Sequence, residues 1–469
     1  MGQKSCLIIC FIVFSLLIFS TFLSKKTDAA ELEVGDNQSY QTISSALDVA
    51  KNGDVIKVLP GIYKEKLTIT KAVTLQSVEK QKAAIQGTQS KHVITINSPN
   101  VVIQGFKISN SGHNFLDNDA GILVEKSDNV KILDNHFTDI LFGIYIDSSN
   151  NLEIIHNQIN GLKGKRLSER GNGIHYFNTK GNVVKGNVIK DVRDGMYFDH
   201  ADGMLVTDNK VTNVRYGLHY MWSNNNTFKN NFFSNNVSGA AIMFSKVIKL
   251  ENNIFEKNRG YRNFGVFFQT AEDSVVENNL FFNNTIGIYS DLSRRNTFKK
   301  NTIVQNDIGM EILGSNWDDV IYENSFVDNL QQVSVNEIKI RDQWFYDNTG
   351  NYWSDYTGVD LEKDGVGNAA FHSGSAFEFF MYKYPHFRLF VESPTAKMLQ
   401  TVDKMFPVIE RAEIVDLFPL TVDMNSLSYM DHMRTQSSRS AGIITFSISL
   451  LIVVLSIGLI CKVSNRFGG

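Results

Sequence analysis

Cysteine is nearly absent from this chain of 469 residues. Its three cysteines are Cys6, Cys10 and Cys461, so residues 11–460 contain no thiol. That region can form neither a disulfide nor a thiolate metal site. Its stability must therefore come from packing.

The chain also lacks an excess of charge of one sign. The net charge is -3 and the isoelectric point is near 6.4, which excludes the broad basic surface of a nucleic-acid-binding protein. Charged residues make up 20% of the chain and hydrophobic residues 43%, so there is enough apolar material for a core. Disorder is excluded for most of the chain.

Long uncharged runs stand near both ends. Residues 6–23 are apolar between Lys4 and Lys25, which predicts a secretory signal peptide, with an uncleaved anchor as the alternative. Residues 441–461 carry no charge and are followed by Lys462 and Arg466, which predicts a single transmembrane helix with a cytoplasmic C-terminus. The body is expected on the extracytoplasmic face of the cell membrane.

The centre of the chain repeats. A glycine followed by an apolar–X–apolar triplet recurs in steps of mostly 22 residues, with two longer steps of 30 and 26 residues. The glycines are Gly121, Gly143, Gly173, Gly195, Gly217, Gly239, Gly265, Gly287 and Gly309. Asparagines follow them at Asn135, Asn157, Asn187, Asn209, Asn231, Asn253, Asn279, Asn301 and Asn324. Three short period-2 apolar segments per repeat predict an all-β fold, a right-handed parallel β-helix of about 22 residues per rung.

Glycine and asparagine are expected to be structural. Glycine supplies unusual backbone angles at one corner of each rung. Asparagine tolerates left-handed angles at another corner, and its amide can bond to the rungs above and below as a ladder.

Caps and insertions complete the predicted architecture. Residues 42–51 have helical spacing and should cap the coil before first strands at 54–59 and 67–70, and the repeat dissolves after Asn329. The longer steps place insertions at 163–170 and 259–263. The expected domains are a signal peptide (1–30), the parallel β-helix (31–350), a C-terminal cap with a short helix and linker (351–436), and a transmembrane anchor with a short cytoplasmic tail (437–469).

One outer face is unusual. Positions one and three after each glycine should point inward, and positions two and four outward. In the middle rungs the outward positions are rich in His, Tyr, Met and Phe, and such patches usually mark a partner surface. His219 and Met221 share a rung, and Met243 should lie directly above Met221. An imidazole and thioethers without thiolate suit Cu(I), so these three are the candidate metal ligands.

Packing beneath a bound partner is the alternative role for these side chains. His175 on the same face is a secondary candidate ligand. His432 and Met433, in the linker before the last apolar run, are further secondary candidates, which could instead lie at the membrane surface.

A catalytic site is the competing hypothesis, because many parallel β-helices cleave or epimerise acidic polysaccharides. That chemistry needs cations beside a general base. The residues available for it are Arg193, Arg215, Asp199, His200 and Asp202. The arginines fall in rung-end turns and the acidic stretch fits a solvated corner, so a non-enzymatic role is favoured.

The C-terminal region carries two further signals. Asp360, Glu362 and Asp364 alternate before Gly365 as in a hard-cation loop, but Phe371 stands where an EF-hand has glutamate. A hydrogen-bonded turn is therefore expected. Ser393-Pro394 predicts the N-cap and first residue of a helix that includes residues 395–406.

These residues resemble the NosD family. The similarity is carried by residues 215–223 (RYGLHYMWS), 239–245 (GAAIMFS) and 351–356 (NYWSDY) through Asp364-Gly365. Ser393-Pro394, residues 405–407 (MFP) and residues 416–419 (DLFP) resemble the family's C-terminal region. The similarity spans roughly residues 32–420, and the rungs with His219, Met221 and Met243 are its more specific part.

The resemblance implies an exported, non-enzymatic scaffold of nitrous oxide reductase maturation. Family members associate with an ABC transporter permease and its ATPase, receive copper from a copper chaperone lipoprotein, and help to supply it to nitrous oxide reductase. This chain is accordingly expected to accept and deliver copper as Cu(I). The C-terminal transmembrane helix departs from the family pattern and would hold the scaffold over its transporter. A cell-surface polysaccharide lyase or epimerase is the alternative function.

Overall fold

The computed structural model describes residues 29–313, 316–335, 341–373, 384, 386, 390, 393–405 and 414–425. The predicted signal peptide up to residue 28, the predicted membrane helix, His432 and Met433 lie outside these residues. Among the helices that are described, none has the length and apolar character needed to cross a bilayer.

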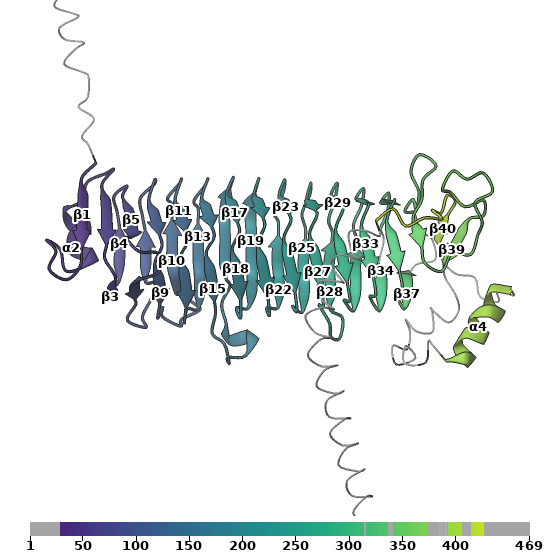
Figure 1. Ribbon diagram of the computed structural model, residues 1–469, viewed down its shortest axis with the longest axis horizontal. Helices are drawn as coiled ribbons and strands as arrows, with labels where there is room; N and C mark the ends of the chain where they lie inside the picture. The colour runs from purple at the N-terminus through teal and green to yellow at the C-terminus, as the bar shows by residue number, and fades with distance from the viewer. Residues whose placement is uncertain are drawn as a thin grey trace, which may run out of the picture.

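Three long parallel sheets wind as a right-handed β-helix of about 14 turns, which confirms the predicted all-β architecture (Figure 1). Sheet A consists of β1 (Glu31–Val34), β2 (Val55–Val58), β5 (Thr74–Ser77), β8 (Val102–Gln104), β11 (Lys131–Leu133), β14 (Glu153–Ile155), β17 (Val183–Lys185), β20 (Leu205–Thr207), β23 (Thr227–Lys229), β26 (Lys249–Glu251), β29 (Val275–Glu277), β32 (Thr297–Lys299) and β35 (Val320–Tyr322).

Sheet B consists of β3 (Gly61–Lys64), β6 (Ala83–Gln86), β9 (Lys107–Ser109), β12 (His136–Thr138), β15 (Gln158–Asn160), β18 (Val188–Lys190), β21 (Lys210–Thr212), β24 (Phe232–Ser234), β27 (Ile254–Glu256), β30 (Leu280–Phe282), β33 (Thr302–Val304), β36 (Ser325–Val327) and β38 (Tyr352–Trp353).

Sheet C consists of β4 (Leu67–Ile69), β7 (Ile94–Ile96), β10 (Ala120–Glu125), β13 (Phe142–Asp147), β16 (Ile174–Lys180), β19 (Asp194–Asp202), β22 (Tyr216–Met221), β25 (Ser238–Met243), β28 (Phe264–Gln269), β31 (Ile286–Asp291), β34 (Ile308–Leu313) and β37 (Gln331–Val335).

The register keeps equivalent residues of successive rungs in columns. Inward columns form one continuous core, in which Phe233, Phe255 and Phe281 stack with ring centroids 5.1 Å apart at both steps. Strand β10 shows the predicted alternation, because Ile122 and Val124 are fully buried and Leu123 is partly exposed. The core therefore grows by one layer with each rung.

The repeated glycines are required for close approach rather than for left-handed angles. Gly217 has no positive φ, so the expectation that these glycines supply unusual angles was wrong. A Cβ added at Gly217 would meet the carbonyl oxygen of Gly239 at 2.3 Å and the Phe233 ring at 2.5 Å. Only a residue without a side chain fits at Gly217 of β22, which lies against Gly239 of β25.

The predicted asparagine ladder is present. Asn231 Nδ2 donates to Asn253 Oδ1 at 3.0 Å, and Asn231 Oδ1 accepts from Asn209 Nδ2 at 3.0 Å. The left-handed conformation lies one residue earlier than expected, for example at Asn230 with φ 56°. The ladder also runs one rung beyond the predicted end, through Asn351.

Asp416 ends this ladder. The carboxylate, which is fully buried, accepts from the backbone N–H of Asn351 at 2.7 Å and from Trp353 Nε1 at 3.0 Å. Burial raises the pKa of Asp416, although these hydrogen bonds oppose the rise. Asp416 closes β40 (Ile414–Asp416), which pairs antiparallel with β39 (Phe371–Ser373) over the last rung.

Helices and turns at the two ends follow the sequence signals. Helix α2 (Ile43–Val49) is capped by Thr42 Oγ1, which accepts from Ser45 N–H at 3.2 Å, and strand β1 precedes it. Helix α4 (Pro394–Met405) starts where Ser393 Oγ accepts from Ala396 N–H at 3.2 Å. Asp360 accepts backbone N–H groups on both oxygens, at 2.6 Å from Lys363 and 2.9 Å from Gly365, as in a hydrogen-bonded turn.

Candidate metal-binding face

The outer face of sheet C carries a column of contacting rings on strands β13 to β22. The register places Tyr145, His175, Tyr197 and His219 one above the other, and Ala241 follows. Centroids of neighbouring rings lie 4.3 Å, 4.5 Å and 4.7 Å apart along this column. These contacts restrict the imidazole of His219 at the last ring of the column.

The two methionines lie beside this column as the sequence predicted. Met221 and Met243 are register partners on β22 and β25, so their backbones are about 4.8 Å apart. Met221 lies two residues after His219 on the same face, about 6.6 Å along the strand. Both thioethers are half-buried, and Tyr197 Oη donates to Met221 Sδ at 3.9 Å. The three candidate ligands are thus brought to one place.

Asp194 fixes the ring of His219. Its Oδ2 lies 3.0 Å from His219 Nδ1, and its side chain is fully buried. Arg215 binds the same carboxylate through two hydrogen bonds, at 2.8 Å to Oδ1 and 2.6 Å to Oδ2. Burial would raise the pKa of Asp194, but the bonds from His219 and Arg215 lower it to about 2. The carboxylate is therefore ionised, and at 3.0 Å it favours the tautomer of His219 that carries the proton on Nδ1 and leaves the Nε2 lone pair available to a metal.

Sequence reasoning missed Asp194. The side chain lies on the outer face although it directly precedes a rung glycine, where simple alternation would point it inward. It meets His219 only because parallel pairing places the two on adjacent rungs, 25 residues apart in the chain. One signal in the sequence could have indicated this ion pair. Asp194 lies one residue before Gly195, and Arg215 lies two residues before Gly217, so the two opposite charges fall at similar positions of successive rungs.

His175 belongs to the ring column rather than to the methionine pair. It lies two rungs from His219, about 9.6 Å away along the coil. Burial lowers the pKa of His175 to about 3, with Arg193 adding to the effect, and Asn172 Nδ2 lies 3.1 Å from its Nδ1. A neutral imidazole packed between two tyrosines fits a structural role.

The residues of the catalytic alternative are not assembled into one groove. Arg215 forms an ion pair with Asp194, which is the first residue of β19. Arg193 Nε lies 3.7 Å from the same carboxylate. Asp199 lies five residues further along β19, about 17 Å away, and is 2.6 Å from His200 Nδ1. The cations and the candidate base therefore stand at opposite ends of a strand.

Exposed rings border the methionine pair. Trp222 and Phe244 follow Met221 and Met243 directly, are 48% and 42% exposed, and stack at 5.9 Å. Both adopt left-handed backbone angles, with φ 45° and 52°, which bulky residues rarely do. Leu292, three rungs beyond Trp222 at the equivalent position, is also exposed with φ 51°. We call Trp222 and Phe244 the aromatic edge.

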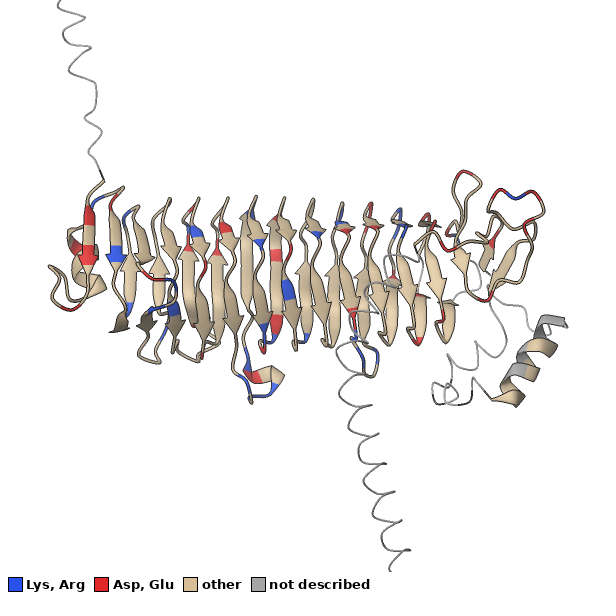
Figure 2. Ribbon diagram, in the orientation of Figure 1, with Lys and Arg blue, Asp and Glu red and all other residues tan. Residues whose placement is uncertain are grey.

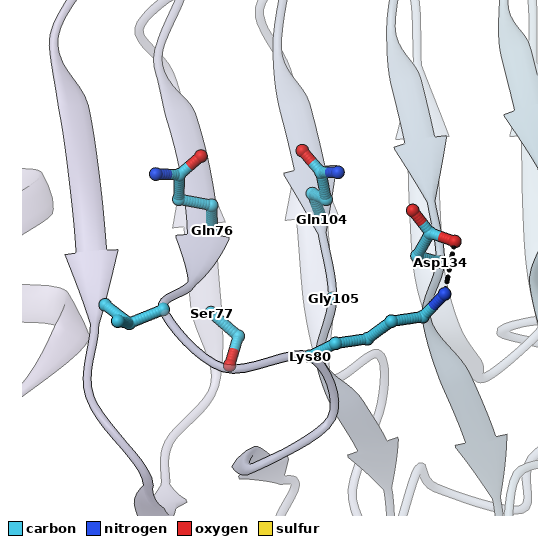
Figure 3. A pocket seen from close by; sticks show the side chains of 7 residues that line it. Gln76, Ser77, Lys80, Gln104, Gly105 and Asp134 are labelled. Carbon is cyan, nitrogen blue, oxygen red and sulfur yellow. Dashed lines mark hydrogen bonds and ion pairs between the residues drawn. The ribbon is translucent and has the colours of Figure 1, made fainter.

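The donor set fits a soft ion better than a hard one. Within the described ranges no group of three or more His, Cys, Asp or Glu side chains is placed to hold a metal. An imidazole with two thioethers suits Cu(I), whereas oxygen-preferring cations need carboxylates. A polar hollow of about 250 Å³ near the N-terminal rungs is unrelated to this face, and Lys80 Nζ and Asp134 Oδ1 form an ion pair of 2.7 Å at its rim (Figure 3).

Comparison of the fold with solved structures gives a glycan-cleaving neighbour. The catalytic domain of a GH87 α-1,3-glucanase in complex with nigerose superposes with a TM-score of 0.55 over 69% of each chain, at 13% identity. That similarity shows the fold alone, because enzymes and non-enzymes share the coil.

Sequence comparisons are more specific. Residues 157–358 match the family model described as periplasmic copper-binding protein (NosD), and residues 77–189 match the right handed beta helix region. A probable ABC transporter binding protein NosD of Stutzerimonas stutzeri is 35% identical over 133 residues, which are 28% of this chain and 30% of the relative. Its namesake in Pseudomonas aeruginosa is 34% identical over 134 residues, with the same shares.

The matched segment thus spans about 30% of the length of these curated relatives. Both are named as binding proteins, and neither name describes an enzyme. The family match includes the rungs that carry Asp194, His219, Met221 and Met243. Over its central β-helix, the chain is therefore similar to the NosD family.

Proposed function

We propose that this chain is an extracytoplasmic scaffold that binds Cu(I) on the outer face of sheet C and passes it on. The observation that carries the proposal is the His219 ring, locked by Asp194 and Arg215 beside two register-paired methionines. Ordering a ligand through a buried carboxylate is how metal sites fix the tautomer of histidine. The family description as a copper-binding protein supports the same cargo.

The geometry favours a transfer site over a storage site. His219 is 13% exposed and both thioethers are half-buried, so an incoming partner can reach the ion. Three neutral donors on an open sheet also bind less tightly than a closed set that includes thiolates. Copper would therefore be cargo, which the scaffold accepts and delivers.

The aromatic edge supports docking of partners next to this site. Exposed aromatic side chains are enriched where proteins bind one another. The proposed partners are a copper chaperone lipoprotein as donor, nitrous oxide reductase as acceptor, and an ABC transporter permease with its ATPase. The names of the relatives support the transporter association. Residues 437–469 would tether the body to the membrane, and an N-terminal signal peptide would export it.

Anaerobic Cu(I) titration against a competing chromophoric chelator tests the proposal. The variant His219→Ala/Met221→Ala/Met243→Ala should bind Cu(I) at least ~100-fold more weakly than wild type, because it loses the whole donor set. The matched control His113→Ala/Met398→Ala/Met424→Ala removes the same side-chain types at exposed positions and should leave the affinity unchanged. Equal affinity of the first variant and wild type would overturn the site.

A further inference from the structure

Four connections from sheet B to sheet C have seven or more residues, and one of them is residues 87–93 between β6 and β7. The other three are residues 110–119 between β9 and β10, 161–173 between β15 and β16, and 257–263 between β27 and β28. Because each joins sheet B to sheet C, all four emerge along the same edge, the lower one in Figure 1. We call this the B–C edge. The copper site does not use these loops, so they need another explanation.

The tips of two of these loops carry isolated apolar side chains. Leu116 is 92% exposed and Tyr261 is 88% exposed, more than any other large hydrophobic residue in the described part of the chain. Phe115, beside Leu116, is 39% exposed. Six rung steps separate β10 from β28, so the two tips stand about 29 Å apart along the coil axis.

Positive charge gathers on two of these four loops. The insertion at 163–170 carries Lys163, Lys165, Arg166 and Arg170 against one carboxylate, Glu169, which pairs with Arg166 at 3.2 Å. Figure 2 shows Lys and Arg on this projecting loop, below the coil.

The second insertion places Arg259 and Arg262 on either side of Tyr261. Arg259 pairs with Asp307 at 2.7 Å, and Arg262 is exposed. The loop that carries Leu116 has no Lys or Arg; its Asp117 lies 4.0 Å from Lys91, and its Asp119 is buried. The chain as a whole is acidic, so the basic character of the two insertions is local.

From this arrangement we infer that the B–C edge rests on an anionic phospholipid bilayer. Leu116 and Tyr261 enter the interfacial layer, and the cations of the two insertions contact headgroup phosphates. Each such cation contributes about 1 kcal/mol near an anionic membrane surface. Tyrosine has an apolar ring and a polar hydroxyl, which suits the level of the headgroups.

A flat, anionic surface with an apolar interior fits better than a protein partner. The parallel pairing between rungs holds the two tips in a fixed line about 29 Å long. Two isolated apolar points, with basic insertions beside one of them and between the two, can both meet a plane, whereas a protein interface needs a continuous packed patch. With this edge on the membrane, sheet C rises from the bilayer and leaves the His219 face open to the side.

The inference is tested on the full chain reconstituted in lipid nanodiscs. Cys6, Cys10 and Cys461 are replaced by serine, and an environment-sensitive fluorophore is attached to a single new cysteine in Leu116→Cys or Tyr261→Cys. Val247→Cys is the matched control, because Val247 is 51% exposed on the edge between sheets C and A. The readout is quenching of the fluorophore by spin-labelled lipid.

In phosphatidylglycerol nanodiscs the labels at 116 and 261 should be quenched at least ~3-fold more than the label at 247. The excess should fall in phosphatidylcholine, in high salt, and with Lys163→Gln/Lys165→Gln/Arg262→Gln, because the attraction to headgroups is electrostatic. Quenching at 116 and 261 equal to that at 247 would overturn the inference. So would labels that respond to poly-glutamate but not to lipid, which would indicate an acidic protein partner. The outcome does not depend on copper binding.

Discussion

The asparagine ladder and the outer face of sheet C repeat in the same rungs, but the side chains of the two columns differ in how many hydrogen bonds they make within the fold. Asn231 has each amide group bonded inside the ladder, to the rung before and the rung after. On the outer face, Met221 and Met243 are aligned just as regularly but have few polar partners. The asparagines bond to one another from rung to rung, so folding alone accounts for their column. The methionines leave soft metal donors half-exposed, so their column is better accounted for by a bound ligand.

The glycine column should show the largest effect on the structural side of this comparison. Gly217→Val places a branched side chain where even a Cβ would lie 2.3 Å from the Gly239 carbonyl oxygen. We expect a loss of more than ~4 kcal/mol in the free energy of unfolding, since neither the Gly239 backbone nor the buried Phe233 ring can move aside. The measurement is urea unfolding followed by circular dichroism. A variant as stable as wild type would show that adjacent rungs can separate there.

Breaking the ladder should have the next largest effect. Asn231→Ala leaves the Val206 carbonyl and the Asn209 amide without their partner, and each buried unsatisfied group costs about 1–3 kcal/mol. Met243→Ala, on the outer face, should change the free energy of unfolding by less than ~1.5 kcal/mol. Similar losses in the two variants would remove the distinction between a structural and a binding column.

Asp194 lies beside the donors of the outer face, and its substitution should weaken copper binding without removing the donors. Asp194→Asn loses the charge that orients His219, and such partners typically contribute 10–100-fold in metal affinity. We expect weaker Cu(I) binding by about that factor, together with a mixture of His219 tautomers in ¹⁵N NMR spectra of the imidazole. Unchanged affinity and an unchanged tautomer would show that Asp194 serves the fold alone.

The smallest effect concerns Asp319, a buried carboxylate that stands between Asn296 and Asp342 in successive rungs. Asp319 Oδ1 accepts from Asn296 N–H at 2.7 Å, and Oδ2 has no hydrogen-bond partner among the described residues. Burial, with a contribution from Asp342, raises the pKa of Asp319 to about 8, whereas an unfolded aspartate titrates near 4. The folded chain therefore holds a proton that the unfolded chain releases, and this contribution to stability is lost as the pH rises from about 4 to about 8.

Asp319→Asn should remove this pH dependence. The variant should gain stability relative to wild type at pH 9 compared with pH 6, by an amount on the order of 1 kcal/mol or more. Urea midpoints of both proteins at the two pH values give the result. Parallel pH profiles would show that Asp319 titrates normally in the folded chain.

The fold was predictable because each turn of a stacked coil needs the same residue types at the same positions, so the sequence repeats. Columns at fixed spacing, such as Gly217 with Gly239, needed no knowledge of tertiary structure. A second ladder, Asn236, Asn258, Asn284, Asn306 and Asn329, was missed although it stands five residues after the first. The spacing of the asparagines predicts that a column of side chains exists. Which residue of the turn has a positive φ depends on the local backbone and could not be predicted from that spacing.

The candidate site was predictable only in part. Met221 and Met243 follow from register, since parallel pairing preserves position in the rung. The carboxylate of Asp194 did not follow, because its direction depends on a local break in alternation next to Gly195. Insertions were located by counting, but the exposure of Leu116 and Tyr261 required the three-dimensional structure.

Asp416 has a consequence for how such a chain can change in evolution. Each rung offers its amide to the next and accepts from the one before, so duplicating or deleting a rung leaves every junction chemically identical. Asp416 is different, because it receives the final donors and passes none on. Lineages can therefore lengthen or shorten the coil by whole repeats, while this single aspartate and the strand that carries it must be inherited unchanged.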